Sequence, residues 1–182
     1  GKEEIKSAVE DNLRHLKLEA IDVVNLRLGE FMEPDETSVA EPLSALIEMK
    51  EKGYVKHIGL STVSEKQLEE ALKMTDIVCI QNMYNIANRA DDAFVDSLAV
   101  RGIAYVPYFP LGGFAPLQLE KLNLLAQNLG VSSMQLALSW LLHRAPNMLL
   151  IPGTSSRGHL RENIAAAGIE LSDETMAQLN SF

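Results

Sequence analysis

Two hydrophobic periodicities alternate along the chain. Segments with an apolar residue at every third or fourth position are typical of an amphipathic helix, and short apolar runs rich in β-branched residues are typical of a buried strand. Lys2 to Lys17 shows the helical pattern, and Ala20 to Leu26 shows the strand pattern. The pattern therefore predicts helices alternating with strands from the start of the sequence.

Further elements of both kinds follow. Helices are expected at Thr37 or Ser38 to about Lys52, Ser64 to about Met74, Asp91 to Arg101, about Leu117 to Leu129, Ser132 to Arg144, about Arg157 to Ala167, and from Ser172 onward. Strands are expected at Ala20 to Leu26, Val55 to Leu60, Ile77 to Gln81, Ile103 to Tyr108 and Met148 to Ile151. Strands that alternate with helices of about 10 to 15 residues indicate βα units and a parallel sheet.

The predicted fold class is therefore α/β, with two architectures open. The strands are almost entirely apolar, as in parallel sheets that helices cover. They fit a doubly wound open sheet or a partial TIM (β/α)8 barrel, because a complete barrel takes about 250 residues and this chain has 182. No linker or low-complexity stretch interrupts the pattern, so residues 1–182 are expected to form a single domain.

Composition restricts the expected partners and compartment. No apolar run approaches the roughly 20 residues that span a bilayer, so no membrane partner is expected. The formal net charge of −9 at pH 7 disfavours nucleic acid, whose phosphates the chain would repel on average. The single cysteine, Cys79, excludes an internal disulfide and is interpreted as a core residue. A chain of this kind is expected in the reducing cytoplasm.

Polar residues stand at the C-terminal end of every predicted strand. They are Asn25 and Arg27, Ser61 and Thr62, Gln81 and Asn82, Tyr108, and Gly153 to Ser156. In parallel α/β folds ligands bind at this edge, because loops and helix N-termini converge there. Five such ends favour a ligand site over ordinary strand termination.

The last of these loops, Pro152 to Ser156, precedes a predicted helix. Small residues allow close approach of a ligand, and the N–H groups of the first helical turn favour an anion such as phosphate. Helix N-capping by Ser155 or Ser156 explains the same residues equally well. The loop alone does not decide between the two.

Several chemical motifs are absent from the sequence. No cluster of His, Cys and acidic residues has metal-ligand spacing, so no metal site is expected. There is no Gly-rich Rossmann fingerprint, no P-loop and no Gly-x-Ser-x-Gly nucleophile elbow. These absences argue against the doubly wound nucleotide sites.

The strand-end residues belong to segments that together resemble one family. In chain order these are Asp22-Val23-Val24-Asn25-Leu26, Ile58-Gly59-Leu60-Ser61, Gln81-Asn82-Met83-Tyr84-Asn85, Tyr108-Phe109-Pro110-Leu111-Gly112-Gly113, and Ile151 to Ser156 with Leu160-Arg161-Glu162-Asn163. Their order and spacing resemble the aldo-keto reductases over almost the whole chain. The resemblance implies the C-terminal part of a (β/α)8 barrel, from its fourth to its eighth strand.

The resemblance also implies a cofactor, NADP(H) or, as the alternative, NAD(H). Ser61 and Gln81 would bind the nicotinamide carboxamide, with Thr62 standing where the family often has asparagine. Tyr108 would stack on the nicotinamide ring. The other implied contacts are Leu111 and Gly112 beside the pyrophosphate, Thr154, Ser155 and Ser156 at the 2′-phosphate, and Glu162 and Asn163 at the adenine.

Three further positions depart from the family pattern. Many relatives place Lys and Arg around the 2′-phosphate, whereas this chain has Gly153 and His159. A hydroxyl-rich helix N-terminus still suits a phosphate, so NADP(H) stays favoured. The family's catalytic histidine at the end of the fourth strand is Arg27 here. A guanidinium can polarise a carbonyl oxygen but cannot supply a proton at neutral pH.

The proton donor of the family has no counterpart in the matched stretch. That donor is a tyrosine, supported by a lysine and an aspartate, on earlier parts of the barrel. Tyr54, Tyr84, Tyr105 and Tyr108 do not match its position. Because carbonyl reduction by hydride needs a proton for the forming alkoxide, the chain is expected to be a fragment that is inactive alone.

Three functional hypotheses follow. The first is an oxidoreductase that interconverts small carbonyl substrates and alcohols with NADP(H), present here as a fragment. The second is a non-catalytic dinucleotide-binding module. The third is a half-barrel whose open strand edges pair, either in a homodimer or with a complementing N-terminal half-barrel.

Overall fold

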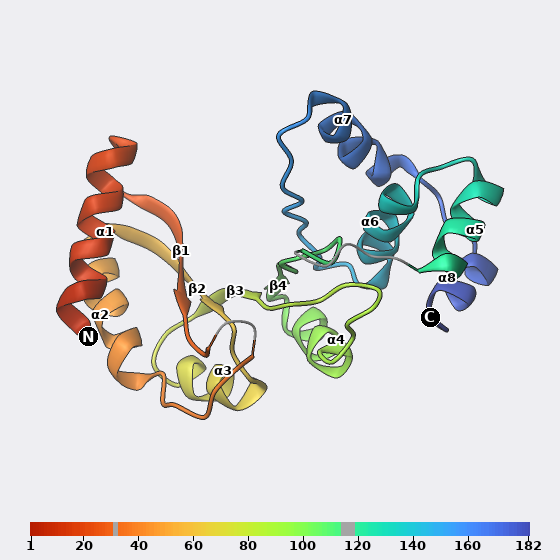
Figure 1. The fold of residues 1–182 in the computed structure, drawn as a ribbon. Helices are drawn as coiled ribbons and strands as arrows, with labels where there is room; N and C mark the ends of the chain where they lie inside the picture. The colour runs from red at the N-terminus through yellow and green to blue at the C-terminus, as the bar shows by residue number, and fades with distance from the viewer. Residues whose placement is uncertain (31–32, 114–118) are drawn as a thin grey trace. The chain divides into compact units, whose positions relative to one another are not determined.

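The computed structural model describes residues 1–30, 33–113 and 119–182, which form two compact units, 1–82 and 83–182 (Figure 1). Each unit has its own buried core. The expectation of a single domain over 1–182 stays a prediction. Within the described ranges, no helix is long and apolar enough to cross a membrane.

The first unit alternates helices and strands. Its elements are α1 (Lys2–Leu16), β1 (Ile21–Arg27), α2 (Ala40–Glu51), β2 (Val55–Ser61), α3 (Glu65–Leu72) and β3 (Ile77–Gln81). β1 pairs with β2 and β2 pairs with β3, both in parallel, as the alternating periodicity predicts. The register places Arg27 opposite Ser61, and Ser61 opposite Gln81.

The two faces of this sheet differ in burial. Ile58, Leu60 and Ile80 are fully buried, and α2 and α3 pack against these strands. The opposite face of β1 is open, with Val23 and Asn25 exposed. Successive side chains of a strand point to opposite faces. One face of each strand therefore builds the core, and the other carries the polar groups predicted at the strand ends.

The second unit is mainly helical. Its elements are α4 (Asp92–Arg101), β4 (Ala104–Tyr105), α5 (Glu120–Leu129), α6 (Ser133–Arg144), α7 (Arg157–Ala165), the 3-10 turn η1 (Ala166–Gly168) and α8 (Asp173–Leu179). Three buried aromatic residues pack in its core: Tyr84 stacks on Trp140 with ring centroids 5.9 Å apart and meets Tyr105 edge-on at 5.6 Å. The Trp140 indole N–H donates to Asn180 Oδ1 at 2.9 Å, which ties the C-terminal residues to this core.

The helices and the first three strands match the predicted elements to within a few residues, but the last two strands do not. The strand predicted at Ile103 to Tyr108 is reduced to Ala104–Tyr105, because Pro107 has no N–H to continue a ladder. The prediction of a strand at Met148 to Ile151 is wrong: this segment forms one bridge, from Met148 to Tyr105. The start predicted for α5 at Leu117 lies outside the described residues, and α5 begins at Glu120.

Candidate functional site

Four of the predicted strand-end residues meet in the first unit. The parallel register places Arg27, Ser61 and Gln81 side by side at the C-terminal ends of β1, β2 and β3. The backbone N–H of Thr62 donates to the carbonyl oxygen of Gln81 at 3.0 Å, so the turn after β2 is fixed to the end of β3. Ser61 and Thr62 are buried, Gln81 is half-buried and Arg27 is exposed.

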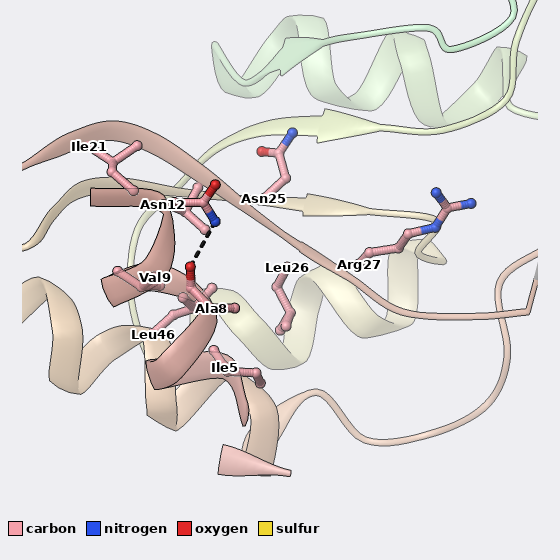
Figure 2. A pocket seen from close by; sticks show the side chains of 10 residues that line it. Ile5, Ala8, Val9, Asn12, Ile21, Asn25, Leu26, Arg27 and Leu46 are labelled. Atoms are coloured by element: carbon pink, nitrogen blue, oxygen red, sulfur yellow. Dashed lines mark hydrogen bonds between the residues drawn. The ribbon is translucent and has the colours of Figure 1, made fainter. Parts of the chain in front are cut away.

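Two polar side chains of β1 project away from the helices. Figure 2 shows Asn25 and Arg27 on one side of the strand, while Leu26 points to the other side, toward Val9 and Leu46. A cavity of about 290 Å³ runs along β1 and α1, and its lining is apolar apart from Asn12, Asn25 and Arg27. Asn25 and Arg27 therefore carry their polar groups on the open face of the sheet.

A hydrogen-bonded network crosses this open face. Asn25 Nδ2 donates to Gln81 Oε1 at 2.7 Å, and the Cys79 thiol donates to Asn25 Oδ1 at 3.3 Å. The sequence places Asn25 among the polar strand ends but assigns it no role. A glycine inside a strand, Gly59, is the signal that another group approaches the backbone there. Burial raises the pKa of the Cys79 thiol, which keeps it protonated and able to donate.

Thr62 has an unusual backbone conformation. Its φ is +57°, in the left-handed region that a β-branched residue rarely adopts. Its side chain packs against Gly29, where an added Cβ would lie 2.9 Å from Thr62 Cγ2 and 2.4 Å from the Glu33 carbonyl oxygen. Residues held in such conformations cluster at functional sites, because the surrounding structure over-determines them.

A second group of predicted residues lines a cavity in the second unit. This cavity of about 470 Å³ is formed by Tyr108, Phe109, Pro110, Leu111, Gly113, Ile151, Pro152 and Gly153. The ring of Tyr108 meets Phe109 edge-on, with centroids 5.4 Å apart. Phe109 has a φ of +55°, and its carbonyl oxygen accepts a hydrogen bond from Asn85 Nδ2 at 3.1 Å. Two loops that are distant in the sequence thus meet around one hollow.

Glycines shape the loop after Tyr108. Gly112 and Gly113 have φ values of +90° and +64°. A Cβ at Gly113 would lie 2.5 Å from the ring of Phe109. Only glycine therefore allows the chain to turn so closely against this ring.

The loop before α7 contains the helix N-cap, which the sequence alone does not distinguish from a phosphate site. Ser156 is the N-cap, and its hydroxyl oxygen accepts from the His159 N–H at 3.4 Å. The Thr154 hydroxyl oxygen accepts from the Ser156 N–H at 3.1 Å. Both hydroxyl groups keep an O–H to donate, because only their oxygens are engaged here. Capping by Ser156 is thus confirmed, and it leaves donors for an anion.

The remaining predicted contact residues lie around the first turns of α7. Gly153, Thr154, Ser155, His159 and Glu162 are exposed, and Ser156 and Asn163 are half-buried. His159 is the only residue with a basic side chain among these predicted contacts. Two arginines that are not among the predicted contacts, Arg157 and Arg161, also lie on α7. The structure thus brings the second-unit residues into two adjoining groups, the cavity and the start of α7.

The tyrosines with the most perturbed pKa values lie in the core of the second unit. Burial raises the pKa of Tyr84 and Tyr105, and the carboxylates of Asp92 and Asp91 that accept from them raise it further. Both phenols are held neutral and engaged as structural donors. Among the residues described, no group of three or more His, Cys, Asp or Glu side chains is placed to hold a metal ion.

Comparison with known proteins decides the family. All of residues 1–182 match the aldo/keto reductase family. The chain belongs to this family. It is 56% identical over 181 residues to a pyridoxine 4-dehydrogenase of Escherichia coli strain K12, with 98% of this chain and 63% of that protein aligned.

Solved aldo-keto reductases share the fold. One, a thermostable aldo-keto reductase crystallised with the inhibitor epalrestat, superposes with a TM-score of 0.88 at 30% identity over 99% of this chain and 66% of its own. Another, from Klebsiella pneumoniae and crystallised with NADPH, has a TM-score of 0.80 at 25% identity over 96% of this chain and 62% of its own. The chain thus spans less than two thirds of the length of these relatives, and its α/β fold corresponds to part of a (β/α)8 barrel.

Proposed function

We propose that this chain carries the NADP(H)-binding part of an oxidoreductase that interconverts carbonyl groups and alcohols. The observation that carries the proposal is the alignment of Arg27, Ser61 and Gln81 across three parallel strand ends in a member of this family. The hydroxyl of Ser61 and the amide of Gln81 suit the two polar groups of a carboxamide. Thr62, fixed to the Gln81 backbone, completes this end of the cofactor site.

We also propose dinucleotide contacts for residues of the second unit. Tyr108 and Leu111 line the cavity of this unit. Tyr108 supplies an aromatic face for the nicotinamide ring, and Leu111 and Gly112 are proposed beside the pyrophosphate. The donors at the start of α7 suit the 2′-phosphate. These are the hydroxyls of Thr154, Ser155 and Ser156 together with His159, with Glu162 and Asn163 proposed beside the adenine.

The preference for NADP(H) over NAD(H) rests on the helix N-terminus. The hydroxyl donors and the first-turn N–H groups of α7 favour a phosphate dianion. NAD(H) is the alternative, because Gly153 and His159 stand where many relatives have fixed cations.

Arg27 is proposed to act on the substrate oxygen. NADPH, when bound, would supply a hydride to the carbonyl carbon, which would leave negative charge on the carbonyl oxygen. The guanidinium of Arg27, which projects from the open face of β1, stabilises this charge (Figure 2). Because a guanidinium does not release a proton at neutral pH, we propose that the proton comes from a group outside this chain.

The substrate class is proposed from the bacterial relative. That protein is a pyridoxine 4-dehydrogenase, 56% identical to this chain. Pyridoxal with NADPH, or pyridoxine with NADP⁺, is therefore the first substrate pair to test. The lone free thiol of Cys79 supports a reducing compartment, so we propose the cytoplasm as the site of action.

Turnover tests this proposal. Pyridoxal-dependent oxidation of NADPH is measured for the chain alone and for the chain fused behind the preceding third of the E. coli relative. We expect no turnover from the chain alone and measurable turnover from the fusion, which Arg27→Met in this chain should lower. A folded fusion without turnover, at any pyridoxal concentration, would refute the enzymatic role.

A second candidate function, self-association, has a separate structural basis. Among the described residues β1 pairs on one side only, and Leu16, Leu18 and Val23 near it are exposed. Open strand edges are templates for pairing. We propose either a homodimer or a complementing N-terminal half-barrel at this edge. Sedimentation showing a monomer at assay concentration would rule out the homodimer.

A further inference from the structure

We infer that Asn25 is a positioning residue that orients the side-chain amide of Gln81, so that Gln81 presents its NH2 group to a nicotinamide carboxamide. This inference rests on the proposed function, in which Gln81 contacts that carboxamide. Asn25 is not one of the cofactor contacts proposed above. The inference gives it a role, and it fixes which polar group of Gln81 the ligand meets.

Asn25 and Gln81 reach each other across an intervening strand. Asn25 lies on β1 and Gln81 on β3, while the register partner of Asn25 is Gly59 on β2. A Cβ built on Gly59 would stand 2.1 Å from Asn25 Oδ1 and 2.5 Å from Cys79 Sγ. Any side chain at this position would therefore block the path, and the bare backbone of Gly59 lets the Asn25 amide extend over β2.

The Cys79 thiol gives this network a direction. Side-chain amides have a donor end and an acceptor end of nearly equal shape, so a neighbour that donates to the oxygen favours one of the two orientations. The S–H of Cys79 donates to Asn25 Oδ1, which turns Asn25 Nδ2 toward Gln81 Oε1 at 2.7 Å. Burial keeps the thiol protonated by raising its pKa, so the donor persists at neutral pH.

The consequence for Gln81 follows from the geometry of its amide. Because Oε1 is turned toward Asn25, the NH2 group points away from Asn25. A ligand beside Gln81 therefore meets a donor, and the complementary group on a nicotinamide is its carbonyl oxygen. A ligand that keeps this carbonyl but lacks the carboxamide NH2 should satisfy Gln81 equally well.

Two ligands can show whether Gln81 offers a hydrogen-bond donor or an acceptor to the nicotinamide. NADP⁺ carries a carboxamide, whereas its 3-acetylpyridine analogue keeps the carbonyl and has a methyl group in place of NH2. Asn25→Asp places an acceptor-only carboxylate beside Gln81, which should turn the Gln81 NH2 inward and its oxygen toward the ligand. NADP⁺ can then offer its own NH2, but the analogue cannot. We expect the analogue-to-NADP⁺ ratio of dissociation constants to rise about fivefold to tenfold, as for one lost hydrogen bond.

A control and a second variant test whether the change in the ratio comes from the orientation of the Gln81 amide. Asn12→Asp makes the same chemical change on α1, where the amide donates to Ala8 O of its own helix, and it should leave the ratio unchanged. Gln81→Glu keeps an acceptor for Asn25 and presents an oxygen to the ligand, so it should raise the ratio in the same direction. If Asn25→Asp does not fold, as judged by circular dichroism, this variant still tests whether Gln81 meets the ligand as a donor, and an unchanged ratio would overturn the inference.

The outcomes distinguish this inference from the proposed function. If the wild-type chain binds neither ligand at millimolar concentration, the proposed cofactor site fails and the inference fails with it. If both ligands bind and neither Asn25→Asp nor Gln81→Glu changes the ratio beyond the Asn12→Asp control, the orienting role of Asn25 is wrong while the cofactor site stands.

Discussion

The side chain of Asn82 and the backbone of Val63 are joined by two hydrogen bonds. Asn82 Oδ1 accepts from the Val63 N–H at 3.0 Å, and Asn82 Nδ2 donates to the Val63 carbonyl oxygen at 2.8 Å. Both residues are buried. The pair fixes the chain just after Ser61 and Thr62, so a side chain at the end of β3 holds the turn that follows β2.

Asn82→Ala should destabilise the first unit strongly. The substitution leaves two buried backbone groups of Val63 without partners, which costs about 2–4 kcal/mol in the free energy of unfolding. Urea denaturation of the chain measures this change. The exposed Asn12→Ala should change stability by no more than about 0.5 kcal/mol. An equal effect of the two substitutions would show that the pair with Val63 contributes nothing.

Gly59→Ala should disrupt the Asn25 network. The added Cβ would overlap Asn25 Oδ1 and Cys79 Sγ, so one of these side chains must move. Overpacking of this kind costs about 1–3 kcal/mol. Gly168→Ala is a matched control, since a Cβ there meets nothing within 4 Å. Thermal unfolding compares the two, and equal melting temperatures would contradict the close approach at Gly59.

Thr62→Asn should stabilise the chain. Asparagine tolerates the left-handed conformation that Thr62 adopts at a φ of +57°, so the substitution should relieve about 1 kcal/mol of backbone strain. Thr75→Asn, at a position that is not in this conformation, should bring no gain. A fall in the unfolding free energy of Thr62→Asn would show that packing against Gly29 outweighs the strain.

The stability of the second unit should depend on the charge of Asp92. Burial alone would raise the pKa of this carboxyl, but hydrogen bonds from Arg89 and Tyr84 outweigh burial and hold its pKa below the ordinary 3.8. A lowered pKa in the folded state stabilises the protein above the unfolded-state pKa, and this contribution is lost as the pH falls through the folded-state pKa.

Asp92→Asn tests this pH dependence. Its deficit in unfolding free energy relative to wild type should be full near about pH 6. The deficit should shrink only as the pH falls below the ordinary 3.8 and through the lowered pKa of folded Asp92. Urea unfolding at several pH values measures the difference. A deficit that stays constant over this range would mean that the charge of Asp92 does not stabilise the fold.

The sequence predicts the parts of the fold that depend on local pattern. Hydrophobic periodicity locates β1, β2 and β3, and the side chains of Ser64 and Ser172 cap the helices predicted to begin there. The pattern fails at Ile103 to Tyr108 and at Met148 to Ile151. Apolar content alone favours a strand in both, yet pairing depends on neighbours and on backbone N–H groups, which Pro107 and Pro152 lack.

The sequence predicts the site residues that stand at strand ends. It does not predict the side-chain contacts that join one strand to another. Ser61 and Gln81 follow from their positions at two strand termini. The link from Asn25 to Gln81 joins residues 56 positions apart and requires the register of β1, β2 and β3. Periodicity does not determine register, so a resemblance to the family identifies Gln81 but not its orienting partner.

Calorimetric titration of the chain with NADP⁺ tests the central claim most directly. We predict saturable binding of one dinucleotide per chain, weakened about tenfold by Gln81→Leu in the first unit and by Tyr108→Leu in the second, since each removes about 1.4 kcal/mol of contact energy. Thermal unfolding checks that both variants stay folded. No binding at millimolar NADP⁺, or binding that neither substitution weakens, would contradict the assignment of these residues to a cofactor site.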